Sequence, residues 1–218
     1  MSRRFPTLFL LGLIPTSALA LGNADAGKRI VMQGNDQGTT ACVSCHGADG
    51  EGNPAAGFPR LAGLSDKYLS KQLRDYRQGT RSNPVMQPIA AALEQQQLLD
   101  VAAYYAGQVP TNTADDAAPP DGGRKLALRG DWDNTIPACV SCHGPGGHGV
   151  DPYFPALAGQ HASYIQSQLE AWRKGSRHND TNDLMRVVAE RLSQTQIQAV
   201  SEYFAAQPAV KPAPGAEQ

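Results

Sequence analysis

The heptapeptide Ala41-Cys42-Val43-Ser44-Cys45-His46-Gly47 recurs in the second half of the chain as Ala138-Cys139-Val140-Ser141-Cys142-His143-Gly144. Each copy contains the Cys-x-x-Cys-His pattern that attaches haem c. Two intervening residues let each sulfur reach one vinyl group of the porphyrin, and the adjacent histidine then meets the iron from the same side. The sequence therefore predicts two covalently bound haem c groups, held through thioether bonds by Cys42, Cys45, Cys139 and Cys142.

Two other interpretations of the four cysteines fit the pattern less well. Disulfides or a thioredoxin-like motif do not require a histidine after both cysteine pairs, and no βαβ pattern surrounds either pair. Zinc would need two more ligands at each site. The chain has no further cysteine, and its other histidines, His148, His161 and His178, all lie in the second half.

The pentapeptides belong to a longer internal repeat, which runs from Gly27 to Gln108 and again from Gly123 to Gln207. The loop Phe58-Pro59-Arg60-Leu61-Ala62-Gly63 recurs as Phe154-Pro155-Ala156-Leu157-Ala158-Gly159. The register then slips by three residues, so that Met86 pairs with Met185. Before the slip, the paired positions are Tyr68 and Tyr164, Gln72 and Gln168, Leu73 and Leu169, Arg77 and Arg173, and Gly79 and Gly175.

Residues 1–20 have the pattern of a secretory signal peptide. Arg3-Arg4 precedes an apolar run, and Ala18-Leu19-Ala20 provides the small residues of a cleavage site. An uncleaved anchor is the alternative, but the apolar run is shorter than the ~20 residues that a spanning helix needs. We therefore expect cleavage after Ala20 and export to the periplasm.

The rest of the chain divides into four segments. Residues 21–108 and 122–207 are the expected N-terminal and C-terminal haem domains. Residues 109–121 are rich in proline and aspartate, which predicts an extended, solvated linker between separable domains. Residues 208–218 form a Pro- and Ala-rich tail that we expect to be disordered.

The periodicity within each repeat is helical. One helix is predicted between Ser65, as its N-cap, and Gly79, as its stop. Further helices are predicted over residues 24–33 and 122–129, around Leu98 to Tyr105, and after the capping box of Ser193 and Gln196. No strand pattern stands out. The expected fold is all-α, with two tandem loop-rich domains, each built round a covalently bound haem that supplements a small apolar core.

Each iron needs a ligand on both faces of the haem. His46 and His143 are the predicted proximal ligands. Met86 and Met185 are the predicted second ligands, because each follows a polar loop and precedes the last helix of its repeat. A thioether favours ferrous iron, so His/Met ligation raises the reduction potential. Met32 has no methionine partner in the second repeat, which favours a packing role.

The remaining notable residues are predicted to have ordinary roles. His178 is the nearest rival to Met185, but no histidine stands at its place in the first repeat, and we expect a solvated or locally hydrogen-bonded side chain. Trp132 and Trp172 are predicted to pack in the core or against a haem edge. The chain has 19 Lys and Arg residues against 20 Asp and Glu, without clusters, which gives no support to nucleic acid binding.

These motifs resemble the cytochrome c4 family, in which two class I cytochrome c domains stand in tandem. The resemblance covers Gly27 to Gln207. It is carried by both Cys-x-x-Cys-His-Gly sites, both Phe-Pro-x-Leu-Ala-Gly loops, the Tyr-x-x-x-Gln-Leu helices, the segment Asn83-Pro84-Val85-Met86 and the closing aromatic helices. The second methionine loop, residues 179–185, departs from the tighter first loop by its greater length.

The resemblance has three implications. The carbonyls of Pro59 and Pro155 would accept the ring N–H of His46 and His143, respectively. The two haems would lie near each other across the domain interface. The protein would pass electrons from a quinol-oxidising complex toward a terminal oxidase.

The leading hypothesis from the sequence is a periplasmic electron carrier and not an enzyme, because two irons closed by His and Met offer no open position for a substrate. It would shuttle electrons between a respiratory donor complex and a terminal oxidase or reductase. One alternative is the cytochrome subunit of a flavoprotein or quinoprotein dehydrogenase. Another is a dihaem enzyme of the peroxidase or thiosulfate-oxidising type. The expected partners are redox proteins, and peripheral association with the membrane is left open.

Overall fold

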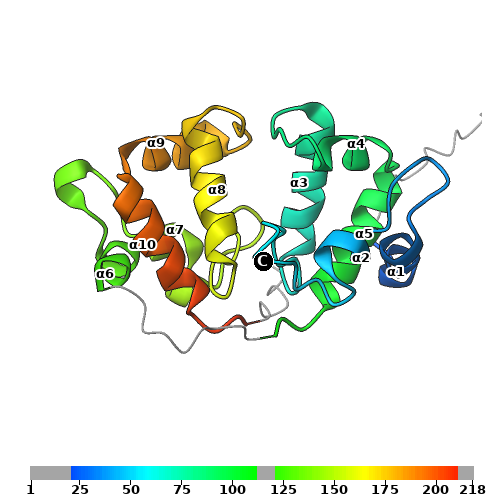
Figure 1. Ribbon diagram of the computed structural model, residues 1–218, viewed down its shortest axis with the longest axis horizontal. Helices are drawn as coiled ribbons and strands as arrows, with labels where there is room; N and C mark the ends of the chain where they lie inside the picture. The colour runs from blue at the N-terminus through cyan, green and yellow to red at the C-terminus, as the bar shows by residue number, and fades with distance from the viewer. Residues whose placement is uncertain (1–20, 112–120, 211–218) are drawn as a thin grey trace, which may run out of the picture.

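The computed structural model describes residues 21–111 and 121–210 of the chain. These residues form two helical units that lie side by side (Figure 1). Within the described ranges, strand-like pairing is limited to isolated bridges. The all-α prediction is therefore confirmed. The predicted signal peptide lies outside the described residues, as do residues 112–120 of the expected linker and residues 211–218 of the expected tail.

Both units repeat one arrangement of helices. In the first unit the helices are α1 (Ala24–Gln33), α2 (Val43–His46), α3 (Asp66–Gln78), α4 (Met86–Ala91) and α5 (Gln95–Gly107). In the second they are α6 (Asp121–Arg129), η1 (Trp132–Asn134), α7 (Val140–His143), η2 (Pro145–Gly147), α8 (Ala162–Arg173), η3 (Thr181–Asp183), α9 (Leu184–Arg191) and α10 (Gln194–Ala205). None of the described helices is long and apolar enough to cross a membrane.

The helix ends follow the capping residues that the sequence contains. Ser65 accepts a hydrogen bond from the backbone N–H of Tyr68 at the start of α3, and Gly79 ends that helix in the left-handed conformation. Ser193 and Gln196 form the predicted capping box of α10. Helix α1 has the predicted bounds. These predictions are confirmed.

The first and last helices of each unit cross at a glycine. A Cβ atom added at Gly27 of α1 would lie 1.9 Å from the carbonyl oxygen of Asp100 in α5. The same crossing recurs in the second unit, where a Cβ at Gly123 would lie 2.0 Å from the carbonyl oxygen of Ala199. Only glycine lets the helix backbones approach this closely.

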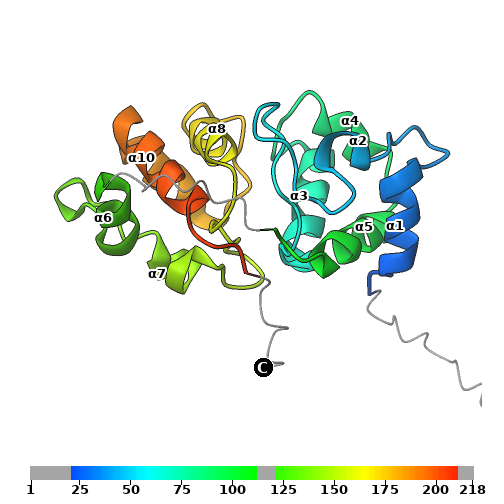
Figure 2. The same ribbon diagram turned by 60° about the horizontal axis from the view of Figure 1, so that its bottom comes forward.

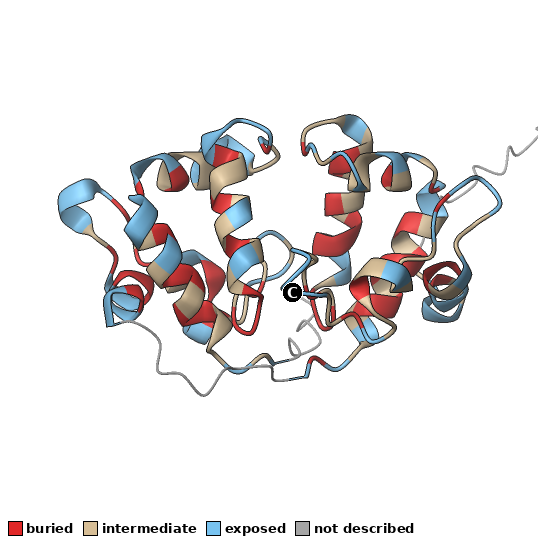
Figure 3. Ribbon diagram, viewed as in Figure 1, coloured by how far each residue is buried: buried red, intermediate tan, exposed pale blue. Residues whose placement is uncertain are grey.

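Each unit has its own apolar core. Val31 from α1 and Leu98 and Tyr105 from α5 are fully buried in the first core, and Ile197 and Phe204 from α10 are buried in the second. The buried faces of the helices turn toward the interior of their own unit (Figure 3). Helices α3 and α8 face each other across the middle of the molecule, an arrangement that also shows in the turned view (Figures 1 and 2).

The two units are joined by more than the linker. The loops after α3 and α8 meet in an antiparallel bridge between Arg81 and Arg177. Around it, the N–H of Ser82 donates to the carbonyl of Ser176 at 2.8 Å, and the N–H of His178 donates to the carbonyl of Thr80 at 2.9 Å. Two domains held only by a tether would not share such contacts. The units therefore contact each other directly as well as being consecutive in the chain.

Candidate functional site

The two Cys-x-x-Cys-His segments form one-turn helices that point a histidine inward. In α2, the buried His46 places its Nδ1 atom 3.2 Å from the carbonyl oxygen of Pro59. In α7, the buried His143 places Nδ1 2.8 Å from the carbonyl oxygen of Pro155. These hydrogen bonds are those that the resemblance implied. They fix each ring and leave Nε2 free to bind a metal.

Burial sets the protonation of the residues in both segments. It lowers the pKa of His46 and of His143, against the opposing effect of their backbone acceptors, which favours the neutral imidazole that an iron requires. Burial also raises the pKa of the Cys42 and Cys139 thiols to about 11. None of the four cysteines forms a disulfide, so the structure is consistent with thioether attachment.

Met86 is held at the start of α4 by a capping side chain. The Oδ1 atom of Asn83 accepts hydrogen bonds from the backbone N–H groups of Val85 and Met86, both at 2.9 Å. Asn83 therefore fixes the point at which the chain turns into the helix, and with it the backbone from which the Met86 side chain extends.

Met185 is held in the same way, but by a different residue of its loop. Asp180 Oδ2 accepts from the N–H of Met185 at 2.7 Å, while Asp180 Oδ1 accepts from the indole N–H of Trp172 at 2.9 Å. The extra loop residues are taken up by η3, where Asn182 and Asp183 adopt positive φ angles. The longer loop therefore still delivers a methionine from a capped helix.

One continuous cavity of about 520 Å³ joins the two segments. Its lining includes every residue that the sequence predicted as a haem attachment or axial ligand: Cys42, Cys45, His46, Met86, Cys139, Cys142, His143 and Met185. Most of the remaining lining is apolar, with Leu69 and Ile89 from the first unit and Leu169 and Val188 from the second. The cavity has a polar middle where the units meet.

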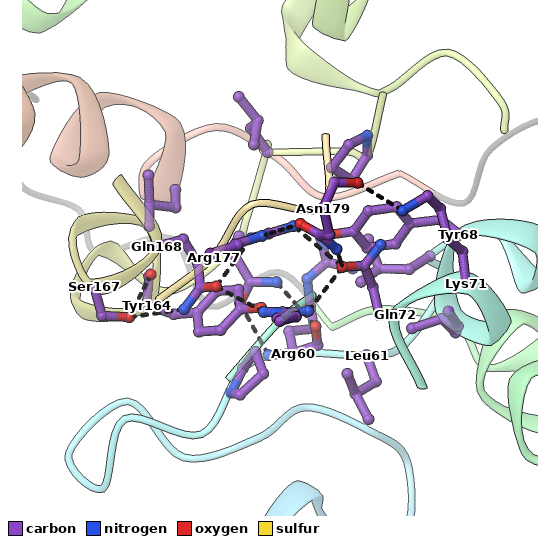
Figure 4. A pocket seen from close by; sticks show the side chains of 18 of the residues that line it. Arg60, Leu61, Tyr68, Lys71, Gln72, Tyr164, Ser167, Gln168, Arg177 and Asn179 are labelled. Atoms are coloured by element: carbon purple, nitrogen blue, oxygen red, sulfur yellow. Dashed lines mark hydrogen bonds between the residues drawn. The ribbon is translucent and has the colours of Figure 1, made fainter. Parts of the chain in front are cut away.

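Two arginines, Arg81 from the first unit and Arg177 from the second, lie at this middle. Figure 4 shows Arg177 among Gln72, Tyr68 and Gln168. Arg81 donates to Gln72 of its own unit at 3.0 Å and to Tyr164 and Gln168 of the other unit at 2.6 and 2.7 Å. Arg177 mirrors it, donating to Gln168 of its own unit at 2.9 Å and to Gln72 and Tyr68 of the other at 3.2 and 3.3 Å. The two guanidinium groups therefore share their acceptors.

This pair of arginines is electrostatically unusual. Both side chains are buried, and neither forms an ion pair with a carboxylate of the described residues. Burial alone would raise the pKa of Tyr68, but Arg177 and Arg81 hold that pKa below its ordinary value. Buried charges are normally paired, because desolvation is costly. The site therefore suits a ligand that brings its own carboxylates.

The donor set and the cavity fit two haems of the c type. Two cysteines, a neutral histidine with a free Nε2 and a thioether line each end of an apolar cavity. A haem carries two propionates, and these carboxylates would form ion pairs with the guanidinium groups of Arg81 and Arg177.

The methionine, tryptophans and histidines that were not predicted as haem ligands lie in different environments. Met32 packs against the first core and Trp172 is buried in the second, as predicted. His178 is bonded locally to the carbonyl of Gly175. His161 is instead buried, and its Nε2 atom reaches the carbonyl of Glu51 across the interface at 2.7 Å. The prediction for Trp132 is wrong: the residue is 69% exposed and does not line the cavity, whereas Ile136, four residues later, is buried in the second core.

The polar residues of the interface were missed by the sequence analysis. Arg81 and Arg177 stand at equivalent positions of the repeat, two residues beyond the paired glycines 79 and 175, and this pairing was the signal that could have found them. Arg60 left no such signal, because its partner in the repeat is Ala156.

Comparison with known proteins agrees with the geometry. The family model for cytochrome c matches residues 24–106 and 131–207. The crystal structure of reduced cytochrome c4 from Pseudomonas stutzeri superposes with a TM-score of 0.76 at 38% identity, over 85% of this chain and 99% of that one. The chain belongs to the cytochrome c4 family. As a member with two tandem domains, it binds two haem c groups covalently and is a dihaem electron carrier.

Two further relatives of this cytochrome c4 homologue are named for thiosulfate oxidation. A thiosulfate dehydrogenase electron acceptor from Stutzerimonas stutzeri (strain A1501) is 51% identical, over 84% of this chain and 86% of that protein. The structure of a thiosulfate dehydrogenase from Marichromatium purpuratum superposes with a TM-score of 0.79 at 44% identity. That match covers 84% of this chain but only 40% of the other, so this cytochrome corresponds to less than half of that chain.

Proposed function

We propose that this cytochrome accepts electrons from a thiosulfate-oxidising dehydrogenase in the periplasm and passes them on through two His/Met-ligated haems. The observation that carries the electron-transfer role is the single cavity, whose walls contain a histidine and a methionine from each repeat. Two closed irons separated by one shared interface suit the transfer of single electrons, since neither offers a free position to a substrate.

Each residue of the cavity has a role in this proposal. Cys42 and Cys45 attach the first haem, and His46 and Met86 are the ligands of its iron. The second haem is attached by Cys139 and Cys142 and ligated by His143 and Met185. Each haem supplies one Fe(III)/Fe(II) couple when bound. The chain fixes the imidazoles through the carbonyls of Pro59 and Pro155 and excludes water with its apolar lining.

The dehydrogenase partner is supported by the comparisons. A relative with half of its residues identical is named as the electron acceptor of thiosulfate dehydrogenase. In the Marichromatium purpuratum structure, a portion similar to this chain is part of a longer polypeptide named thiosulfate dehydrogenase. If this chain is separate from its dehydrogenase, the two proteins would have to dock for electrons to pass. This arrangement agrees in part with the alternative raised from the sequence, a cytochrome subunit of a dehydrogenase.

A second candidate is a free carrier between a quinol-oxidising complex and a terminal oxidase. It is favoured by the match to cytochrome c4 of Pseudomonas stutzeri, which this chain covers almost completely. The periplasm suits both candidates, since residues 1–20 have the pattern of a cleaved secretory signal.

Rapid mixing distinguishes the two candidates. The oxidised holoprotein is mixed with a purified thiosulfate dehydrogenase and thiosulfate, and the α band of reduced haem is followed in time. We expect rapid reduction that requires both the dehydrogenase and thiosulfate. Mixtures that lack either one are the controls. Reduction by a quinol-oxidising complex with quinol, and not by the dehydrogenase, would overturn the proposal in favour of the free carrier.

A further inference from the structure

A single peptide group lies between the first histidine and the second domain. Its carbonyl oxygen belongs to Pro59 and faces Nδ1 of His46 at 3.2 Å. Its N–H belongs to Arg60 and donates to Oε1 of Gln160, in the other domain, at 2.9 Å. Three groups are thereby joined in series: the Gln160 amide, the 59–60 peptide and the His46 imidazole.

Gln160 is held firmly in this position. Its Nε2 atom donates to the carbonyl of Arg60 at 2.9 Å, and its Oε1 atom also accepts from the N–H of His161 at 3.1 Å. The Arg60 side chain closes the contact from the other side, donating to the carbonyls of Gly159 and Ala158 at 3.1 and 2.9 Å. Arg60 is 1% exposed and Gln160 is 4% exposed, so water does not compete for these groups.

The order of these bonds has an electronic consequence. When the N–H of a peptide donates a hydrogen bond, the peptide is polarised and its carbonyl becomes a better acceptor, and the effect is larger in a buried site. A better acceptor draws the Nδ1 proton and makes the imidazole a more basic ligand. A more basic ligand stabilises ferric iron and lowers the reduction potential.

The second domain has no equivalent arrangement. The repeat places Ala156 where the first domain has Arg60, and Leu64 where the second has Gln160. Leu64 has no polar side-chain atom, and Ala156 packs with it in the first apolar core. The near-symmetric interface therefore has a polar contact beside the first histidine and an apolar contact beside the second.

We propose that Gln160 of the second domain is a positioning residue for His46 of the first, and that it tunes the potential of the first haem across the domain interface. The inference rests on the proposed ligation of that haem by His46. It makes the first haem sensitive to the docking of the second domain, while the second haem lacks the reciprocal connection.

The test is a redox titration of the holoprotein with Gln160→Met, which keeps the length of the side chain and removes both hydrogen bonds to Arg60. The two haems are followed separately through the NMR signals of their methyl groups. We expect the reduction equilibrium constant of the first haem to rise about threefold, or about 30 mV at 59 mV per tenfold for one electron. The second haem should keep its potential.

Ser163→Ala is the matched control. It removes another hydrogen bond across the interface, from Ser163 Oγ to the carbonyl of Pro54 at 3.1 Å, without touching Arg60. It should shift neither haem. The reciprocal exchange Leu64→Gln independently tests whether a glutamine at this position tunes the haem of the other domain. If Gln160→Met does not fold, this second variant alone tests the inference. It offers an acceptor to the N–H of Ala156 and should lower the potential of the second haem.

An unchanged first haem in Gln160→Met, or an equal shift of both haems, would overturn the inference. For the reciprocal exchange, an unchanged second haem would do so. Haem content, measured in each sample by the pyridine haemochrome spectrum, separates this failure from that of the proposed function. Fewer than two haems per chain would contradict the proposed function itself. Two bound haems without the expected shifts would contradict only the inferred effect of Gln160 on the first haem.

Discussion

At the scale of single residues, the axial methionines have the most direct effect on the redox behaviour. Replacing Met185 by His should leave the second iron low-spin but exchange a soft thioether for a stronger donor to ferric iron. We expect the reduction equilibrium constant of that haem to fall at least about a hundredfold, or about 120 mV at 59 mV per tenfold. Spectroelectrochemical titration measures the change.

Met32→Leu is the matched control for this exchange, because Met32 packs against the first core and does not line the cavity. It should leave both potentials unchanged. If Met185→His left the second potential where it was, and Met32→Leu moved it, the ligand assignment would be wrong.

The residues of the haem sites differ in how far the sequence could identify them. The cysteines and histidines follow from local spacing, since the chemistry of attachment fixes that spacing. Met86 needed the repeat, because a lone methionine is usually a packing residue. Arg60 and Gln160 could not be predicted, since they are far apart in the chain, have no counterparts in the repeat and act only where the domains meet.

At the scale of helices, the crossing of α1 and α5 depends on a residue without a side chain. Gly27→Ala would force a methyl group against the Asp100 carbonyl and separate the two helices. Overpacking of this kind costs about 1–3 kcal/mol of unfolding free energy. Urea unfolding of the holoprotein, followed by far-UV circular dichroism, measures the loss.

Gly122→Ala is the control for that substitution. Gly122 lies in α6, and a Cβ atom there would meet nothing within 4 Å. Alanine favours helix more than glycine does, so this variant should be as stable as the unchanged chain or slightly more stable. Equal destabilisation by both substitutions would show that the crossing is not the cause.

Helix positions were more predictable than loop conformations. Ser65 and Ser193 mark helix starts because their hydroxyl groups satisfy free backbone N–H groups, a local effect that a sequence displays. The loop before Met185 was less accessible to prediction. Asn182 and Asp183 adopt positive φ angles in this longer loop, and no local sequence pattern predicts which residues of a longer loop will do so.

For the complete chain, the main question is how strongly the interface holds the two domains together. The composition of residues 109–121 predicts an extended, solvated linker, but a linker's composition carries no information about the surfaces of the domains that it connects. The paired arginines 81 and 177 show why these surfaces stay together. Each arginine donates hydrogen bonds to acceptors of both units. Separating the domains would therefore remove hydrogen-bond acceptors from two cationic side chains at once.

Arg60 provides a test of this coupling. In Arg60→Ala, the carbonyls of Ala62, Gly159 and Ala158 lose a buried donor, which we expect to cost about 2–4 kcal/mol of unfolding free energy. Because two of these carbonyls belong to the second domain, the substitution weakens the contact between the domains. Differential scanning calorimetry of the unchanged holoprotein should show the domains melting in one transition, and that of the variant should show two.

Lys67→Ala is the control at this scale. Lys67 also reaches across the interface, to Asp151 at 3.5 Å, but its side chain is 67% exposed. An exposed ion pair contributes at most about 1 kcal/mol, so this variant should keep a single transition. Two transitions in the unchanged protein would contradict the coupling. A single transition in Arg60→Ala at a lower temperature would instead assign the coupling to Arg81 and Arg177, whose shared acceptors Gln72 and Gln168 remain in place.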